Sequence, residues 1–168
     1  MEADDAVPRR GTERERRFGM DGYDAMDAAR AARAVLQEAG YCATMKVHRV
    51  LYLAQAAAAA ACAEPLLAEP FRATSHGPVL ASLLPLHRGR FVIGPEDARG
   101  WGTGAPVPHP LLADTARLCA RVSSCALLDA IMGEGCVRAA LRRGDMAEIA
   151  YGDMAAPWVL ERLRRGRW

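Results

Sequence analysis

Ser75 and His76 are the residue types from which a catalytic nucleophile and its general base are built. Adjacent residues of an extended segment point to opposite sides, so these two side chains are poorly placed to share a proton. The chain also lacks the Gly-x-Ser-x-Gly pattern of a nucleophile elbow. We therefore favour a His76 that bonds a turn carbonyl over a hydrolase, which stays open as a third hypothesis.

The sequence also lacks the residue spacings that are typical of metal sites, disulfide frameworks and phosphate-binding loops. The four histidines, His48, His76, His87 and His109, contain no His-x-x-x-His pair. The five cysteines contain no Cys-x-x-Cys pair, which favours buried thiols over a zinc site or a disulfide framework. The glycine-rich segment 100–104 is not followed by Lys-Ser/Thr, so it does not resemble a phosphate-binding loop. The sequence predicts no catalytic residues, no metal and no cofactor.

A basic C-terminus is the feature that could contact phosphates. It contains Arg162, Arg164, Arg165 and Arg167, with Trp158 and Trp168 nearby as stacking surfaces. A positive last turn also complements the helix dipole, and this structural explanation is favoured. Basic and acidic residues nearly cancel over the chain, 22 against 20, so nucleic-acid binding is not favoured and any basic patch must be local. A nucleic-acid-associated regulator remains the second hypothesis.

Length and composition predict one folded domain. The chain has 168 residues, of which 51% are hydrophobic and 25% charged. Residues 1–22 mix charges with glycine and proline and hold almost no large apolar groups, which predicts a disordered tail before a domain at 23–168. The sequence shows no apolar membrane span and no secretion signal, so we expect a cytoplasmic location.

Hydrophobic periodicity predicts a mainly α fold. We expect a helix at 25–39 capped by Asp24, and a central alanine-rich helix from Thr44 to about Ala63. A third helix should open at Gly77-Pro78. Later helices are predicted from Pro110, from Ser123 or Ser124, at 137–142, at 146–151 and from Pro157. Short β segments are expected near 71–74 and 90–93, which completes a single compact helical domain around the central helix.

Polar side chains are concentrated in the first half of the predicted central helix, whose second half is a run of alanines. They are Lys46, His48, Arg49, Tyr52 and Gln55. This asymmetry predicts that the second half is buried and that the first half reaches the surface, where it can meet a partner. The alternative is that these residues form only a solvated face.

Two segments resemble one known family. Met45 to Gln55 is similar to the Lys-Leu-Gln-Lys-Leu-Leu-Tyr-Tyr-Ala-Gln helix of the Panacea antitoxin family, also called SocA-like. Glu64 to Val79 resembles that family's Glu-Pro-Leu, acidic-Pro and Ala-Trp-x-x-Gly-Pro-Val run, with Thr74 in place of the tryptophan. A weaker likeness at Pro157-Trp158 extends the resemblance to about residues 24–160.

The resemblance implies a non-enzymatic protein that binds and neutralises a cognate toxin by protein–protein contact. The toxin would be encoded by a neighbouring gene, and a relative acts as an adaptor that delivers its toxin to a protease, so a protease is a further expected partner. Related copies occur in prophages. The expected partner-binding residues are Lys46, Arg49, Tyr52, Gln55 and His76. The motif residues expected to be structural are Pro65, Leu66, Gly77, Pro78, Val79, Pro157 and Trp158. No membrane partner is expected, and the oligomeric state is left open.

Overall fold

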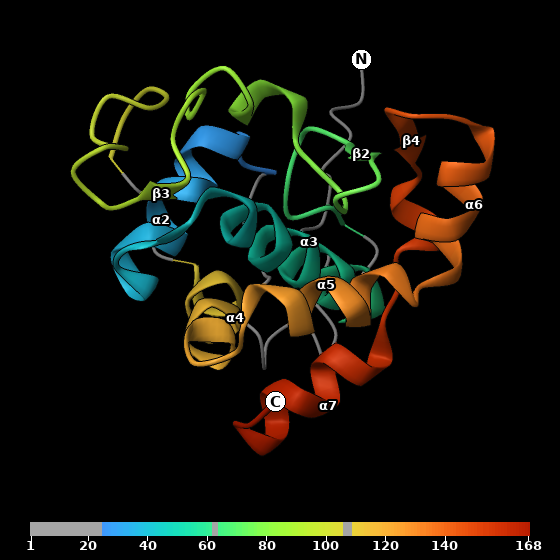
Figure 1. Cartoon of the computed structure of the whole chain (residues 1–168). Helices are drawn as coiled ribbons and strands as arrows, with labels where there is room; N and C mark the ends of the chain where they lie inside the picture. The colour runs from blue at the N-terminus through green and yellow to red at the C-terminus, as the bar shows by residue number, and fades with distance from the viewer. Residues whose placement is uncertain (1–24, 62–63, 106–108) are drawn as a thin grey trace, which may run out of the picture.

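The computed structural model describes residues 25–61, 64–105 and 109–168. These residues form a mainly helical fold with six α-helices and two small antiparallel sheets of two strands each. Figure 1 shows helix α3 at the centre, with α2, α4, α5 and α7 arranged around it. The predicted tail at 1–22 and the predicted cap Asp24 lie outside the described residues.

Helix α2 (Ala28–Ala39) begins where a side chain caps it. The carboxylate of Asp27 accepts a hydrogen bond of 2.9 Å from the backbone amide of Arg30, and the helix stops at Gly40, whose φ of 68° suits glycine. The predicted start at 25 is wrong, because Met26 is extended and forms an isolated parallel bridge with Leu67. This bridge ties the entry to α2 to the segment that follows α3.

Helix α3 (Thr44–Ala61) is the central element and is buried along nearly its whole length. It packs against α2, α4, α5 and α7, so it has neighbours on every side. The small side chains of Ala56, Ala57 and Ala58 are fully buried, and alanine lets neighbouring elements approach the helix backbone closely. The predicted central alanine-rich helix is therefore present in the structure.

The first small sheet pairs β2 (Phe71–Ala73) with β4 (Ala147–Ile149) in antiparallel register, with Arg72 opposite Glu148. The predicted strand near 71–74 is confirmed. The helix predicted at 146–151 is wrong, because Gly144 (φ 138°) and Met146 (φ 60°) have positive φ and turn the chain back toward β2. Strand pairing with β2 overrides the local helical pattern, and only a short 3-10 turn, η2 (Tyr151–Asp153), follows β4.

The segment after β2 returns alongside it. The backbone groups of Arg72 and Val79 exchange two hydrogen bonds of 2.8 Å, so residues 72–79 form a narrow loop closed by the turn at 74–77. This extended return prevents the helix predicted at Gly77-Pro78, and only the short 3-10 helix η1 (Ala81–Leu83) forms. The second sheet then pairs β1 (Cys42–Ala43) with β3 (Val92–Ile93), which confirms a strand in the predicted 90–93 region.

The C-terminal part is helical. It contains α4 (Pro110–Ala120), α5 (Ser124–Met132), α6 (Gly135–Arg143) and α7 (Pro157–Arg165). Proline stands at the start of α4 and of α7, and the hydroxyl of Ser123 accepts a hydrogen bond of 3.1 Å from the Ala126 amide at the start of α5. These start signals lie where the sequence predicted them. Figure 1 shows α6 and β4 on the side opposite to β3, with α7 at the bottom of the view, where it packs against α3 and α4.

Among the described residues, no helix is both long enough and apolar enough to cross a lipid bilayer.

Candidate functional site

Three of the four α3 residues predicted to bind a partner are turned inward. Arg49 is 7% exposed, Gln55 is 3% exposed and Tyr52 is fully buried. The expectation that the first half of α3 reaches the surface therefore holds only for its first turn, where Lys46 is half-buried, and is wrong beyond it. The reason is the set of elements packed around the helix, which covers its polar positions as well as its alanines. Arg49, Tyr52 and Gln55 therefore offer little or no surface to another protein in this conformation.

Gln55 and Tyr52 hold neighbouring segments of the fold. The Gln55 side-chain oxygen accepts a hydrogen bond of 2.9 Å from the backbone amide of Leu67, which would otherwise be buried without a partner. The Tyr52 ring packs edge to face on Phe71 at 5.4 Å, and its hydroxyl lies 3.3 Å from the Cys136 sulfur. Burial raises the pKa of Tyr52 above its usual value, so the phenol stays protonated.

Arg49 connects three elements. Its guanidinium donates to the backbone carbonyl of Ser124 (2.9 Å), to the Ser124 hydroxyl and to the carbonyl of His76 (3.2 Å). It therefore fastens the start of α5 and the 74–77 turn to the central helix. Burial lowers the pKa of Arg49 from its usual value. No carboxylate among the described residues forms an ion pair with it, so backbone and hydroxyl oxygens solvate this cation.

Lys46 and His76 are the predicted partner residues that do reach solvent. Lys46 is half-buried, and its ammonium donates a hydrogen bond of 2.9 Å to the carbonyl of Ala120, the last residue of α4. This contact suits the negative end of a helix dipole. His76 is exposed in the 74–77 turn. The five predicted residues therefore do not form one surface.

The motif residues around this turn are largely buried. Gly77 has a φ of 105°, and a Cβ added there would lie 2.9 Å from a methyl group of Leu128. Pro78 and Val79 are buried, and the Val79 backbone pairs with Arg72. Earlier in the motif, Leu66 is buried, and its backbone carbonyl accepts a hydrogen bond of 3.0 Å from the backbone amide of Met26. The preceding residue, Pro65, is partly exposed.

The last motif pair, Pro157-Trp158, starts α7. Pro157 occupies the first turn of the helix, where its missing amide proton is not needed. The Trp158 indole nitrogen donates a hydrogen bond to the carboxylate of Glu134, just before α6. This bond ties α7 to the preceding helices.

Ser75, His76 and Asp145 line one shallow groove of about 480 Å³. These are the residue types of a nucleophile, a base and an orienting acid. No hydrogen bond joins any two of these described side chains, and the His76 backbone amide instead bonds the Thr74 hydroxyl at 3.2 Å. The groove does not assemble the relay that a hydrolase requires.

Among the described residues, no group of three or more histidine, cysteine or acidic side chains could hold a metal ion. The cysteines are not uniformly buried as expected: Cys119 is buried, Cys42 and Cys136 are half-buried, and Cys125 is exposed. Burial raises the pKa of Cys119 to about 12, so this thiol is not a thiolate at neutral pH. Cys62 lies outside the described residues.

Sequence reasoning missed a group of exposed apolar residues on and beside the β1–β3 sheet. Phe91 is 90% exposed, Tyr41 67% and Val92 57%. Val92 is paired with Ala43, and the Tyr41 ring lies over Gly94, where an added Cβ would be 2.7 Å from the ring. We call Tyr41, Phe91 and Val92 the aromatic patch. The sequence signal was the apolar run 91–93, since alternation along a strand puts Val92 on the face opposite to the buried Ile93.

A second missed feature is a buried histidine pair. The Nε2 atoms of His48 on α3 and His87 lie 2.9 Å apart, and the Leu80 amide donates to Nδ1 of His48 at 3.1 Å. Because Nδ1 of His48 is an acceptor, its Nε2 carries the proton and donates to His87. Burial lowers the pKa of His48 to about 3 and also lowers the pKa of His87. Both rings are therefore neutral at pH 7. The pair could not be predicted from the sequence, because no characteristic spacing of histidines indicates it.

No protein-family model, curated protein or solved structure matches this chain. The likeness to the Panacea family therefore rests on the motif segments themselves. The function must be argued from the surfaces that the structure exposes.

Proposed function

We propose that this protein is an antitoxin-like binding module that neutralises a cognate toxin by protein–protein contact and catalyses no reaction itself. The motif resemblance supplies the class of partner, and the aromatic patch supplies a contact surface. The observation on which the proposal depends is the exposure of Tyr41, Phe91 and Val92 beside a core that buries other large apolar side chains. The toxin is expected from a neighbouring gene.

Three large exposed apolar side chains on or directly beside one small sheet are a specific signal. Single exposed hydrophobic residues are ordinary, but adjoining ones mark interaction sites. Aromatic residues are also enriched at interfaces, where they fill pockets of the partner and supply much of the binding free energy. Val92 lies on the paired strand β3, and the carbonyl of Phe91 accepts a hydrogen bond of 3.0 Å from the Thr44 amide, so the backbone under these two residues is already held before a partner covers them.

The charged residues beside the patch indicate the charge expected on the partner's surface. Arg88 and Arg90 are exposed just before Phe91, and Arg90 pairs with Asp97. Arg88 makes no ion pair with a described residue. The complementary toxin surface would hold an apolar pocket with an acidic residue at its rim.

The test is rescue of growth. The neighbouring gene is expressed alone and then together with this protein, and co-expression should relieve the growth arrest. A triple variant, Tyr41→Ser/Phe91→Ser/Val92→Ser, should lose rescue and raise the Kd for the purified toxin about 30-fold or more, as removal of central interface residues does. Calorimetric titration of the purified pair measures that Kd.

Met146→Ser is the matched control. Met146 is exposed next to β4, on the side of the molecule opposite to β3 (Figure 1). This variant should rescue growth as the unmodified protein does. Full rescue by the folded triple variant would show that the patch is not the binding surface, and a neighbouring gene without toxicity would refute the antitoxin assignment.

Neutralisation can proceed by direct inhibition or by delivery of the toxin to a protease. The two routes differ in the amount of toxin that remains. Direct inhibition leaves the toxin level unchanged during rescue, whereas delivery shortens the toxin's half-life, which a chase experiment measures. Both routes require the same contact with the toxin.

A further inference from the structure

A groove of about 700 Å³ lies between the C-terminal end of α4 and the end of the chain. Leu118, Val122 and Leu163 supply apolar walls. The polar lining includes Arg117, Arg121 and Arg167, and the Trp168 ring borders the same space. The groove therefore combines an apolar floor, an aromatic ring and guanidinium groups.

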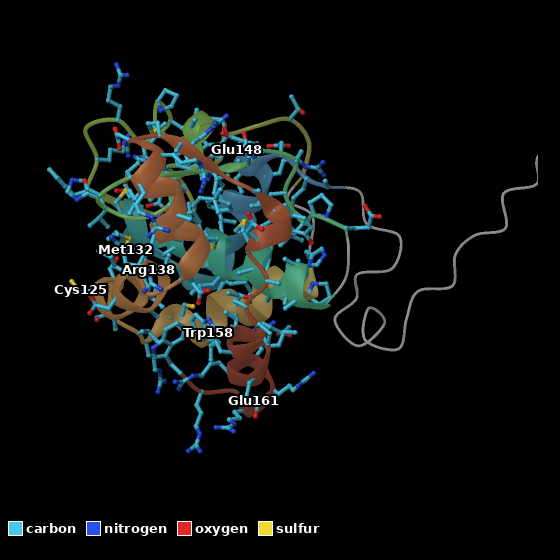
Figure 2. All side chains as sticks on the ribbon, turned by 90° about the vertical axis from the view of Figure 1, so that its right-hand side faces the viewer. Cys125, Met132, Arg138, Glu148, Trp158 and Glu161 are labelled. Carbon is cyan, nitrogen blue, oxygen red and sulfur yellow. The ribbon has the colours of Figure 1, made fainter. Side chains whose placement is uncertain are left out.

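The fold concentrates positive charge at this end of the molecule. Three exposed arginines line the groove, Arg117, Arg121 and Arg167, and three more are exposed on α7, whose end borders it: Arg162, Arg164 and Arg165. The acids among or paired with them are Glu38, Asp114 and Glu161. The local excess is three positive charges, more than the formal net charge of +2 of the whole chain. Figure 2 shows nitrogen-tipped side chains extending around α7, near the labelled Trp158 and Glu161.

These arginines differ in how far they are already paired. Arg117 contacts Asp114 at 3.0 Å and Glu38 at 3.8 Å, and Arg165 contacts Glu161 at 2.9 Å. Arg121 and Arg167 form no ion pair with a described residue, although both line the groove. Two exposed guanidinium groups are therefore available to an anionic ligand.

The aromatic ring is held in place by its neighbours. Trp168 packs edge to face on Trp158 at 5.6 Å, and the Arg162 guanidinium lies 5.9 Å from the Trp168 ring centre. Trp158 is in turn bonded to Glu134. The indole is thus positioned at the groove before any ligand arrives.

We propose that this groove binds single-stranded nucleic acid. One unpaired base would enter the groove against Trp168 and its apolar walls, and the flanking phosphates would contact Arg121 and Arg167. Guanidinium groups match the geometry of phosphate oxygens, and any of the bases can stack on an indole ring. A duplex keeps its bases stacked inside and could use only the charges, so the aromatic and apolar parts of the site favour a single strand.

The competing explanation is that the arginines serve the fold. Helices α4 and α7 both end near the groove, and cations stabilise helix C-terminal ends. That role requires no aromatic ring or apolar floor between the two ends. It predicts that the arginines change stability and not ligand binding.

The experiment measures fluorescence anisotropy of labelled oligonucleotides of about 12 residues, in single-stranded RNA, single-stranded DNA and duplex forms. The full chain should bind single strands more tightly than the duplex, and affinity should fall steeply between about 50 and 200 mM salt. Arg121→Gln/Arg167→Gln should make the slope of log affinity against log salt shallower by about 1.4 for two lost phosphate contacts.

Trp168→Ala should weaken binding about 5-fold or more, and Trp168→Phe should weaken it less. The RNA and DNA arms show which strand is preferred.

Arg138→Gln/Arg142→Gln is the matched control, because it removes the same charge at two exposed positions of α6 that do not line the groove; Arg138 is labelled in Figure 2. It should leave the salt slope unchanged, and thermal unfolding by circular dichroism checks that every variant is folded. Equal binding by the groove and control variants would overturn the proposal, as would tighter binding of duplex. Displacement of the oligonucleotide by polyglutamate at equal charge concentration would instead assign the groove to an acidic protein segment.

Loss of oligonucleotide binding in the groove variants with intact growth rescue would separate this site from the toxin-binding patch.

Discussion

At the scale of single residues, polar groups on α3 serve the interior of the fold. Arg49, Gln55 and His48 each bond a backbone group of another segment, and these bonds fix how those segments meet the helix. Buried polar groups require such partners, since an unsatisfied one destabilises the fold by about 1–3 kcal/mol. Arg49 and Gln55, which the sequence predicted to bind a partner, therefore hold segments of the fold together.

The histidine pair predicts how stability depends on pH. Burial lowers the pKa of His48 to about 3, while the unfolded chain takes up that proton near pH 6.5. Between pH 6.5 and pH 3 the unfolded state therefore binds more protons than the folded state, so the free energy of unfolding should fall as the pH drops through this range. Above pH 6.5, His48 should not make stability depend on pH. Between pH 6.5 and pH 5, this histidine alone should lower the free energy of unfolding by about 2 kcal/mol. Urea unfolding at several pH values measures it.

His87→Gln tests the source of that pH dependence. The amide oxygen can still accept the proton of His48 Nε2, but one titrating ring is removed. The variant should lose stability less steeply than the unmodified protein between pH 7 and pH 5, whereas His76→Gln, in the exposed turn, should behave as the unmodified protein does. An identical slope in all three proteins would contradict the role of the pair.

At the scale of elements, the alanines of α3 set how closely its neighbours approach. Ala57 is fully buried, whereas Ala60, one turn further along the same helix, is half-buried. A larger side chain at Ala57 must displace packed neighbours, which destabilises cores by about 1–3 kcal/mol. Close packing around α3 is thus a property of particular positions.

The prediction is a contrast between two substitutions of one kind. Ala57→Leu should lower the free energy of unfolding by about 1–3 kcal/mol, and Ala60→Leu should change it less, although the helix propensity changes equally in both. Urea unfolding compares them. Equal losses would mean that propensity, and not packing, decides the effect.

At the scale of the whole molecule, one hydrophobic core reaches from α2 to α7. Leu36, Leu51, Leu112 and Val159 belong to the same cluster, and Trp101 in the loop before α4 joins it. Trp158 and Trp168 pack against it from the C-terminal end. Residues from most of the described chain therefore share one stabilising unit, which favours cooperative unfolding.

This architecture predicts a single unfolding transition. Helical circular dichroism and tryptophan fluorescence should give the same urea midpoint, because Trp101 and the two C-terminal tryptophans report on the same core. Trp101→Phe, which leaves fluorescence only from the C-terminal end, should keep the coincidence. An earlier fluorescence transition in that variant would show that α7 unfolds on its own.

The sequence by itself predicted the elements whose ends are marked by local chemistry. Pro110, Ser123 and Pro157 start helices, Gly40 stops one, and the alanine run belongs to the central helix. These signals act through neighbours within one helical turn, so they can be recognised without knowing the rest of the fold. The strand at 71–73 followed in the same way from its local pattern.

Only the tertiary structure decided which surfaces face solvent. The pattern at 146–151 became a strand because β2 lies beside it. The polar side chains of α3 were covered because the segment 67–87 and the start of α5 pack on them. Likewise, Arg117 and Arg121 joined the C-terminal arginines only through the packing of α4 near the end of the chain. Burial, pairing and local charge depend on residues far apart in the chain, because packing, and not sequence distance, determines which groups become neighbours.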